Sequence, residues 1–580
     1  MKVIGIHDGH CATACYLKDG KIISLVSEER FTNVKNQGGF PIHSLKWILT
    51  ENKLSIEEID KIALGSYAMW DWGHEDEIVY NNRLRSSILR LSKFFPKSIL
   101  GSNFAIDFFL FVMKRSRRKM INRYCSKYNL DVKKIEIVEH HSAHALSALY
   151  GSGFTNSVDS VLIFTSDASG DGLSNTVSTW KKSEGYKRIQ FRSAFHSLGM
   201  IYAEVTKFLG MRANEHEYKI MGMAPYVPLE YSERAFKKFK EYIDFDPESG
   251  EIINKKGSGN LFLESFKEDF YRERFDNICA GIQRHFEYII ISWIKYWVEK
   301  TGIQSVVFGG GSFMNVKGNM LIYDLKEVKN LFICPSCGDE SIALGASYKV
   351  ALELGEKELH PIETLYLGPE YSDRSIIDAI TKNKSKLEYK LVKDIETEIA
   401  RLLSKGMIVA RFQGKSEWGA RALGNRSILC RGDDPRVIHK LNKSIKMRDF
   451  WMPFAASMLE EDSKKYLDNS RNIVSRFMML TFRTKSPSNY EIFCGLHPYD
   501  FTCRPQMVSK ESNPAYFRLL TKFKALTGIS GLVNTSFNLH GFPIVGTPEV
   551  ALNTLISSKI DYLAIGSYLI WRKDINLKLK

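Results

Sequence analysis

Three histidines lie within five residues in the segment Glu139–Ala145, in a chain that holds 14 histidines altogether. His140 and His144 are four residues apart, so a helix here would place both imidazoles on one face, one turn apart. Two such nitrogens combined with carboxylates suit a divalent metal ion. The alternative is the capped start of a helix whose histidines face solvent.

Asp167 and Asp339 are the candidate carboxylate ligands for this metal. Asp167 follows the apolar run Ser160–Phe164, and Asp339 comes just before the small-residue helix start Ser341–Ala346. Each of these aspartates could instead cap the N-terminus of a helix, a role that aspartate often fills. Only their positions in space decide between the two interpretations.

A second group of residues with chemical potential is the segment Arg411–Arg448, which holds ten basic and three acidic residues. Because the planar guanidinium group binds phosphate through two hydrogen bonds, a pocket lined in this way suits a triphosphate plus a small oxyanion. An RNA-binding surface and a solvated basic helix face are the competing interpretations. Further along, Asn534–Asn538 offers hydroxyls and backbone N–H groups to an anion, or simply forms a turn.

Two similar strand–turn units must position these residues. The apolar run Val3–His7 leads into Asp8 and Gly9, and the run Ser160–Phe164 leads into an acidic, glycine-containing stretch at 165–172. Two such units predict a duplicated α/β domain, in which a ligand lies where strand ends face each other.

Between and after these units the pattern is mainly helical. Phe286–Lys300 predicts an apolar helix that Gly302 ends, and Ser305–Phe308 predicts a buried strand. The strand is followed by Gly309, Gly310 and Gly311, which indicate a nucleotide cleft or a crowded turn. A domain boundary is expected near residues 355–370, and the remainder predicts a second α/β domain.

Composition narrows the function classes. The chain has 580 residues, 44% of them hydrophobic and 25% charged, which excludes a disordered chain, a collagen and a coiled coil. The net charge of +15 suits a partner that carries phosphate, although a lysine-rich proteome would give the same excess. The chain shows no signal peptide, and its most apolar stretch, near 99–113, falls short of a membrane span. Its nine cysteines do not have the spacing of a disulfide framework. We expect a reduced, cytoplasmic protein with no membrane partner.

Taken together, these segments resemble the O-carbamoyltransferase family of NodU, CmcH and TobZ type. The similar stretches run in the family's order over nearly the whole chain. They are 4–8, 28–32, 139–145, 218–226, 309–315, the signature EWGARALGNRS at 417–427, 441–448, 504–506 and 534–538.

The resemblance implies two domains. Residues 1–358 would form an actin-like (ASKHA) duplicated carbamoyl-transfer domain like that of the tRNA threonylcarbamoyl transferases. Residues 359–580 would form a YrdC-like α/β domain that makes carbamoyl adenylate.

The resemblance also implies an ATP-dependent reaction in the second domain. Carbamoyl phosphate would yield carbamate and phosphate, and the carbamate would attack the α-phosphorus of ATP, with Mg²⁺ on the triphosphate. The residues expected to clamp phosphate are Arg421, Arg426, Arg448 and Arg504. Lys415, Asn425, Asn534 and Ser536 are expected to make further contacts.

In the first domain the resemblance implies that His140, His144 and Asp339 hold a divalent metal, iron in this family, with Asp167 beside it or ligating. The nucleotide would contact Gly309–Gly311, Asn315 and Lys219. His7 or Asp8 would accept the proton of the attacking hydroxyl, because a strand-end His or Asp can face the cleft. For His7 a buried structural role is the alternative.

The expected acceptor is a small-molecule hydroxyl on a specialised metabolite or glycan, and residues 66–126 are expected to shape its pocket. No nucleic acid is expected as a partner, and a homodimer is expected from the family. Four residues depart from the family pattern, and among them Met452 removes one phosphate contact. The other three are His10, Cys11 and Phe542. The rival functions are tRNA threonylcarbamoylation and a non-catalytic nucleotide-responsive binding module.

Overall fold

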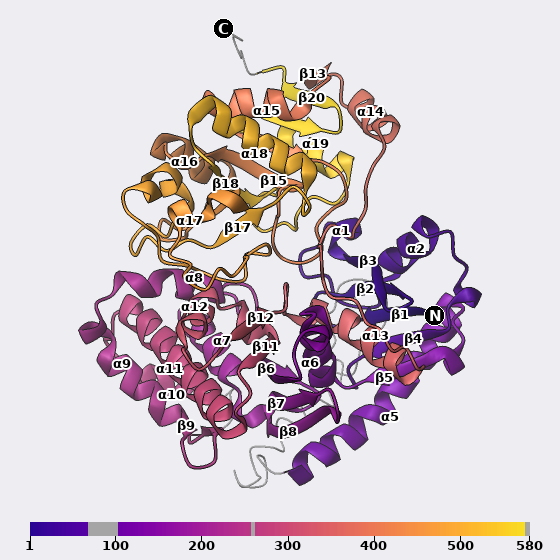
Figure 1. Cartoon of the computed structure of the whole chain (residues 1–580), viewed down its shortest axis with the longest axis vertical. Helices are drawn as coiled ribbons and strands as arrows, with labels where there is room; N and C mark the ends of the chain where they lie inside the picture. The colour runs from indigo at the N-terminus through magenta and orange to yellow at the C-terminus, as the bar shows by residue number, and fades with distance from the viewer. Residues whose placement is uncertain (68–102, 257–261, 575–580) are drawn as a thin grey trace. The chain divides into compact units, whose positions relative to one another are not determined.

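The computed structural model describes residues 1–67, 103–256 and 262–574 (Figure 1). The chain forms two compact units. The first comprises Met1–Glu28 and Gln37–Ile362, and the second comprises Glu29–Asn36 and Glu363–Lys580. The division therefore falls at 362/363, four residues beyond the expected position. The early segment Glu29–Asn36 groups with the second unit, and nothing in its composition indicates this.

The first unit contains two five-stranded sheets with the same topology (Figure 1). The first sheet has the order β3-β2-β1-β4-β5, in which β1, β2 and β3 are antiparallel and β4 and β5 run parallel to β1. Its strands are β1 (Lys2–His7), β2 (Thr13–Lys18), β3 (Lys21–Ser27), β4 (Lys61–Gly65) and β5 (Ile135–Val138).

The second sheet repeats this pattern in the order β12-β11-β6-β7-β8, again with three antiparallel and two parallel strands. Its strands are β6 (Ser160–Gly170), β7 (Leu173–Lys181), β8 (Gly185–Ser193), β11 (Ser305–Gly309) and β12 (Asn330–Ile333). The duplication predicted from the sequence is confirmed. One detail of the prediction is wrong, because β6 does not end at Phe164 but continues to Gly170, with an irregular register after Ser166.

Helices surround these sheets, and one of them, α11, is longer than the sequence predicted. The helices are α2 (Ile42–Glu51), α5 (Asn103–Tyr128), α6 (His140–Gly151), α7 (Leu198–Phe208), α8 (Glu217–Met223), α9 (Leu229–Tyr242), α10 (Phe262–Asp269), α11 (Phe275–Thr301), α12 (Val316–Asp324) and α13 (Ile342–Glu353). A short hairpin joins β9 (Ile243–Asp246) to β10 (Glu251–Asn254). The predicted helix at Phe286–Lys300 is the second half of α11, which ends at left-handed Gly302 as expected.

Helix α13 packs unusually close to α6 and to β1, and two glycines make this possible. A Cβ on Gly345 would lie 1.8 Å from the carbonyl oxygen of Ala143 in α6. A Cβ on Gly5 would lie 1.9 Å from the carbonyl oxygen of Ala343 in α13. These contacts fix α6, which carries the three clustered histidines, against the start of α13.

The second unit is a mixed α/β fold with one eight-stranded sheet in the order β13-β20-β19-β14-β15-β18-β16-β17. Its strands are β13 (Leu387–Leu391), β14 (Val409–Phe412), β15 (Arg426–Arg431), β16 (Ala455–Leu459), β17 (Pro505–Val508), β18 (Gly531–Ser536), β19 (Tyr562–Ile565) and β20 (Tyr568–Arg572). Its helices are α1 (Glu29–Thr32), α14 (Asp373–Lys382), α15 (Ile395–Ser404), α16 (Pro435–Leu441), α17 (Ser463–Tyr466), α18 (Pro514–Thr527) and α19 (Pro548–Ile556).

Both faces of this sheet are covered, as the alternation along β14 illustrates. Val409 packs in a core with residues of α15 and α18, whereas Ala410 and Phe412 pack in a core with residues of α14, α16 and α19. A sheet buried on both faces needs apolar residues at successive positions. Charged side chains within such strands are therefore exceptional, and β15 begins with one, Arg426.

Candidate functional site

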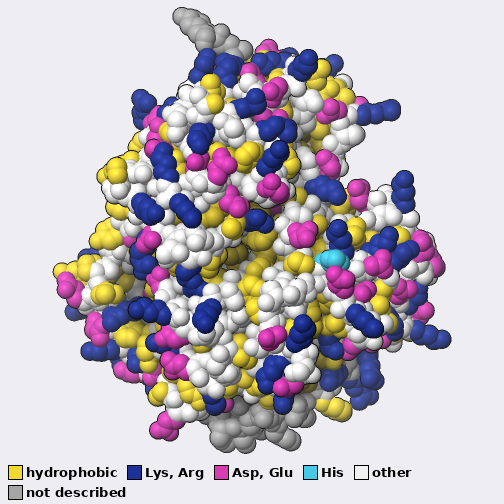
Figure 2. Space-filling model, in the orientation of Figure 1, with side chains coloured by type: hydrophobic (Ala, Val, Ile, Leu, Met, Phe, Trp, Pro, Cys, Tyr) yellow, Lys and Arg dark blue, Asp and Glu magenta, His cyan; other side chains and the backbone are white. Residues whose placement is uncertain are grey.

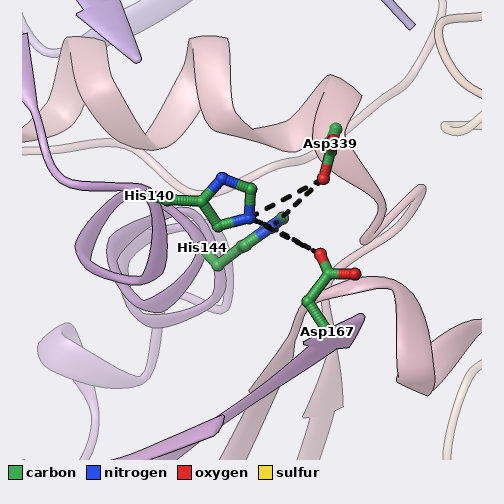
Figure 3. Close-up of side chains that lie close together, drawn as sticks. All are labelled: His140, His144, Asp167 and Asp339. Atoms are coloured by element: carbon green, nitrogen blue, oxygen red, sulfur yellow. Dashed lines mark hydrogen bonds and ion pairs between the residues drawn. The ribbon is translucent and has the colours of Figure 1, made fainter. Parts of the chain in front are cut away.

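The first candidate site is built by four side chains of the first unit (Figure 3). His140 and His144 project from the first turns of α6, Asp167 from the irregular part of β6, and Asp339 from the short 3₁₀ turn Asp339–Ser341. One ligand atom from each of the four residues lies within 4.8 Å of the other three. The structure thus brings together the four residues that the sequence nominated for a metal.

The start of α6 is what places both imidazoles on one face. Glu139 caps this helix, because its carboxylate accepts hydrogen bonds from the backbone N–H groups of His141 and Ser142, at 3.0 and 2.8 Å. The same carboxylate pairs with Arg188 of β8. The third histidine, His141, turns elsewhere, and its Nδ1 lies 2.8 Å from Thr165 Oγ1.

The distances show a compact set of ligand atoms. The Nε2 atoms of His140 and His144 are 3.1 Å apart, and Asp167 Oδ2 lies 3.6 Å from the first and 3.2 Å from the second. Asp339 Oδ1 lies 3.7 Å from both nitrogens. Asp167 Oδ2 is buried and has no hydrogen-bond partner among the described residues.

The electrostatics of the four residues call for positive charge at this point. Burial lowers the pKa of His140, but the neighbouring Asp167 and Asp339 outweigh it and raise the pKa to about 9. Burial raises the pKa of Asp167, but His140 and His144 hold it well below its usual range. Two nitrogens and two carboxylates this close together match the donor set that binds a divalent transition metal, so the residues fit such an ion.

His7 and Asp8 end β1 beside this site, and their surroundings differ. His7 Nε2 lies 3.8 Å from Asp339 Oδ2 and 3.1 Å from the carbonyl oxygen of His10, and its buried Nδ1 has no hydrogen-bond partner within the described ranges. Burial lowers the pKa of His7 to about 4, so its ring is neutral. Asp8 is held by Arg117 of α5 through two hydrogen bonds of 2.7 and 2.8 Å. Both oxygens of Asp8 are therefore engaged within the fold.

The triple glycine lies directly against the metal-ligand set. A Cβ on Gly309 would lie 2.6 Å from the carbonyl oxygen of His144, and one on Gly310, which has a φ of +94°, would lie 2.3 Å from that of Ser166. A Cβ on Gly311 would lie 3.2 Å from Asp167 Oδ1. Gly309 and Gly310 are required because only a bare backbone fits between α6 and β6.

The other two expected nucleotide contacts are placed differently. Asn315 caps α12 through a 3.0 Å bond from Gly318 N–H, and it exchanges two hydrogen bonds with Gln283. The hydrogen bonds of its side chain are thus made to other residues of the first unit. Lys219 lies half-buried on α8. Residues 68–102, most of the segment expected to shape the acceptor pocket, lie outside the described residues.

The second candidate site lies in the second unit, where three of the four predicted arginines gather. Burial and the positive charges of Arg421 and Arg448 together hold the pKa of Arg504 well below its usual range. Arg448 lies over the Phe454 ring and donates to Thr535 Oγ1 at 3.4 Å. Mutually repelling guanidinium groups that are all half-buried indicate a site for an anion, which would offset their repulsion.

Lys446 belongs to the same group. The sequence indicates it only as one of the ten basic residues of Arg411–Arg448 and predicts no individual role for it. It is buried, and burial together with Arg448 holds its pKa well below its usual range. Its ammonium group donates to the side chains of Ser536 and Asn538, at 3.2 and 2.6 Å. Ser536 is therefore part of this site, as expected, although it contacts Lys446 rather than standing alone.

Arg426 does not join this group, and its placement departs from the expected phosphate contact. Its two terminal nitrogens donate to four backbone carbonyls, at distances from 2.8 to 3.1 Å. Its guanidinium carbon lies 3.7 Å from the centre of the Phe412 ring, and the residue is fully buried. Its terminal N–H groups thus bind backbone carbonyls of the same unit rather than face a ligand. Burial lowers its pKa to about 10.

The remaining predicted contacts are mostly engaged within the second unit. Asn425 accepts from Arg411 and Asn513 and donates to the carbonyl of Lys415. Asn534 donates to the carbonyl oxygen of Ala422, which adjoins Arg421, and its buried Oδ1 has no partner in the described part of the chain. Lys415 is exposed.

Glu417, in the EWGARALGNRS segment, organises the same loop. One of its oxygens accepts hydrogen bonds from the backbone N–H groups of Leu423, Asn425 and Arg426, at 2.8 to 3.1 Å. Sequence reasoning did not assign this residue, although it is the one acidic residue of the 417–427 signature, which is a usable signal.

The basic excess of the chain is not gathered into one stripe on the face drawn in Figure 2. There, Lys and Arg side chains are interspersed with Asp and Glu. Among the described residues, no helix is long and apolar enough to cross a membrane.

Comparison with known proteins shows the family. Residues 2–348 match the model described as carbamoyltransferase N-terminus, and residues 400–572 match the one described as carbamoyltransferase C-terminus. The chain therefore belongs to the carbamoyltransferase family and is an enzyme of that class. The resemblance found in the sequence is confirmed.

Two relatives and one solved structure illustrate the range of the similarity. An uncharacterised protein of Methanocaldococcus jannaschii is 35% identical over 76% of this chain and 74% of its own length. Nodulation protein NolNO of Sinorhizobium fredii is 29% identical over 98% of this chain and 79% of its own length. Full-length HypF in its phosphate- and nucleotide-bound form matches 62% of this chain and 56% of its own, at 14% identity and a TM-score of 0.32. The last likeness is too low to bear on activity.

Proposed function

We propose that this carbamoyltransferase is ATP-dependent, uses carbamoyl phosphate and modifies a hydroxyl of a small molecule. Carbamoyl phosphate and water give carbamate and phosphate, and the carbamate oxygen then attacks the α-phosphorus of ATP, releasing pyrophosphate. The hydroxyl of the acceptor attacks the carbamoyl carbon of the adenylate, AMP leaves, and the hydroxyl proton passes to a base.

The observation that carries the proposal is the presence of two sites with opposite electrostatic demand in one carbamoyltransferase chain. The half-buried arginine group around Arg504 suits the phosphates of ATP and carbamoyl phosphate, so we assign adenylate formation to the second unit. Arg421, Arg448 and Lys446 would stabilise charge that develops on the transferred phosphoryl group. Arg426 has a structural role in this assignment.

We assign carbamoyl transfer to the first unit. His140, His144, Asp167 and Asp339 would hold a divalent cation, for which iron is the family's expectation. Such a cation, when bound, would polarise the carbamoyl carbonyl or orient the phosphate. His7, neutral and with its Nε2 adjacent to Asp339, would accept the hydroxyl proton, and Gly309–Gly311 would let the nucleotide approach the protein backbone closely.

Other parts of the proposal follow from the family. The first unit would have an actin-like fold and the second a YrdC-like fold, and the protein would work in the cytoplasm as a homodimer. The acceptor would be a specialised metabolite or glycan, and no nucleic acid would be needed. Salt-dependent binding of tRNA would favour threonylcarbamoylation instead.

The test is exchange of labelled pyrophosphate into ATP with no acceptor present. Exchange that requires carbamoyl phosphate would establish the adenylate. The matched controls omit carbamoyl phosphate or replace it with phosphate alone. Folded, metal-loaded protein that shows no exchange under any of these conditions would contradict the proposed activation step.

A further inference from the structure

Each of the two histidines has its second ring nitrogen against a buried serine hydroxyl. His140 Nδ1 lies 3.0 Å from Ser66 Oγ, and His144 Nδ1 lies 3.0 Å from Ser341 Oγ. Both serines are buried, with 1% and 0% of their surface exposed. Water therefore has no ready access to replace either hydroxyl.

These contacts bear on which ring nitrogen carries the proton. A neutral imidazole that binds a cation through Nε2 must carry its hydrogen on Nδ1, and a hydrogen-bond acceptor at Nδ1 holds the ring in that tautomer and plane. In both histidines the Nε2 atom is the one that faces Asp167 and Asp339 (Figure 3). The serine hydroxyls stand on the opposite side of each ring, where an accepting oxygen is needed.

The backbone holds both hydroxyls rigidly. Ser66 follows β4 with a left-handed φ of +71°, and its N–H donates to the carbonyl oxygen of Val138, two residues before His140. Ser341 ends the short turn that begins with Asp339, and its N–H donates to the carbonyl oxygen of Gly338. One turn thus supplies both a carboxylate ligand and the hydroxyl that orients a histidine ligand.

We infer that Ser66 and Ser341 are positioning residues for the cation. They keep both imidazoles in the Nδ1–H tautomer and direct both Nε2 atoms to the point that the aspartates face, and this raises the affinity for a divalent ion. The inference rests on the proposed cation site. It adds two residues that are separated by 74 and 197 positions from the histidines they orient.

The test measures binding of Co²⁺ to metal-free protein by calorimetry and by the visible absorption of the bound ion. Ser341→Ala and Ser66→Gly remove one hydroxyl each, and glycine is chosen at 66 because it accepts the left-handed backbone. We expect each variant to bind Co²⁺ about 10- to 100-fold more weakly and to give an altered absorption band. Ser341→Thr, which keeps a hydroxyl, should recover most of the affinity.

The matched control is Ser347→Ala. Ser347 is also fully buried on α13, but its hydroxyl donates to the carbonyls of Ala343 and Leu344 rather than to a ligand. This variant should bind Co²⁺ as the unmodified protein does, and thermal melts of the metal-free proteins check that all variants are folded. If Ser341→Ala and Ser66→Gly bind Co²⁺ as tightly as the control, the inference is overturned. If the unmodified protein binds no Co²⁺, the proposed cation site itself fails.

Discussion

The two candidate sites bring together side chains of different types and suit ligands of opposite charge. In the first unit, two carboxylates and two imidazoles face one another, so that the aspartates raise the pKa of His140 and the histidines lower the pKa of Asp167. In the second unit, three guanidinium groups and one ammonium group lie together, and burial together with positive neighbours lowers the pKa values of Arg504 and Lys446. The first arrangement attracts a cation, and the second attracts an anion.

This difference shows how a ligand-binding arginine can be told from a structural one when both are largely buried. Arg426 and Arg504 are both largely buried, but the two terminal nitrogens of Arg426 donate to four carbonyl oxygens, whereas Arg504 has no carboxylate partner among the described residues and is destabilised by two other arginines. A guanidinium whose terminal nitrogens are satisfied by the backbone supports the fold. One that is held against like charges is available to a ligand.

The largest effect is expected from His144→Ala. Loss of one of four ligands should lower carbamoyl transfer at least about 100-fold, while carbamoyl phosphate-dependent pyrophosphate exchange continues. Both half-reactions are measured on the same preparation. The control is His285→Ala, which removes another buried histidine of the first unit, whose hydrogen-bond partner in the described part of the chain is the carbonyl of Ile243. Loss of exchange in His144→Ala would break the proposed division between the two sites.

Arg504→Met should have the reverse pattern. Removal of a preorganised charge that faces a phosphoryl group costs about 10²- to 10³-fold in rate, so exchange should fall by that factor while Co²⁺ binding stays unchanged. Arg431→Met is the matched control, because Arg431 pairs with Asp433 in the same unit. Normal exchange in Arg504→Met would mean that the anion site lies elsewhere.

Arg426→Met sharpens the contrast between the two kinds of arginine. It leaves four backbone carbonyls without their donors, and we expect it to lower the free energy of unfolding by about 3–4 kcal/mol. Calorimetry measures the change, with Arg436→Met as the exposed control that should cost under about 0.5 kcal/mol. A variant that melts normally but has lost exchange would return Arg426 to the catalytic role predicted from the sequence.

The smallest effect concerns the helix that carries the histidines. Burial raises the pKa of Glu139, but Arg188, His141 and Ser142 outweigh it and lower the pKa to about 2. A depressed carboxyl pKa stabilises the fold above the unfolded pKa of about 4.5, and this contribution is lost as the pH falls from there toward 2. Arg188→Met should therefore cost up to about 3 kcal/mol at pH 7.

Unfolding in urea across the pH range measures this change. The difference between Arg188→Met and the unmodified protein should shrink steadily below pH 4.5. A difference that is the same at pH 3 and pH 7 would show that Arg188 acts by packing rather than by charge.

Sequence patterns were most informative where the geometry is local. The i, i+4 spacing of His140 and His144 depends only on the helix, and the two strand–turn repeats depend on alternation and turn residues, so both could be predicted. Partners distant in the chain could not. Nothing near Arg426 indicates that carbonyls of Pro369 and Gln413 will take its donors, and nothing near His144 points to Ser341.

The interrupted course of the second unit bears on how the chain is made. Arg30 donates to the carbonyl oxygen of Gly419, and its own carbonyl lies so close to Gly546 that a Cβ there would come within 1.6 Å. At 5–20 residues per second, a ribosome needs about 25–100 s to travel from Asn36 to Gly546. During this time Glu29–Asn36 lacks its contacts with the second unit, because the rest of that unit has not yet been synthesised. A separately expressed 363–580 fragment should lack this piece and recover it only from an added peptide.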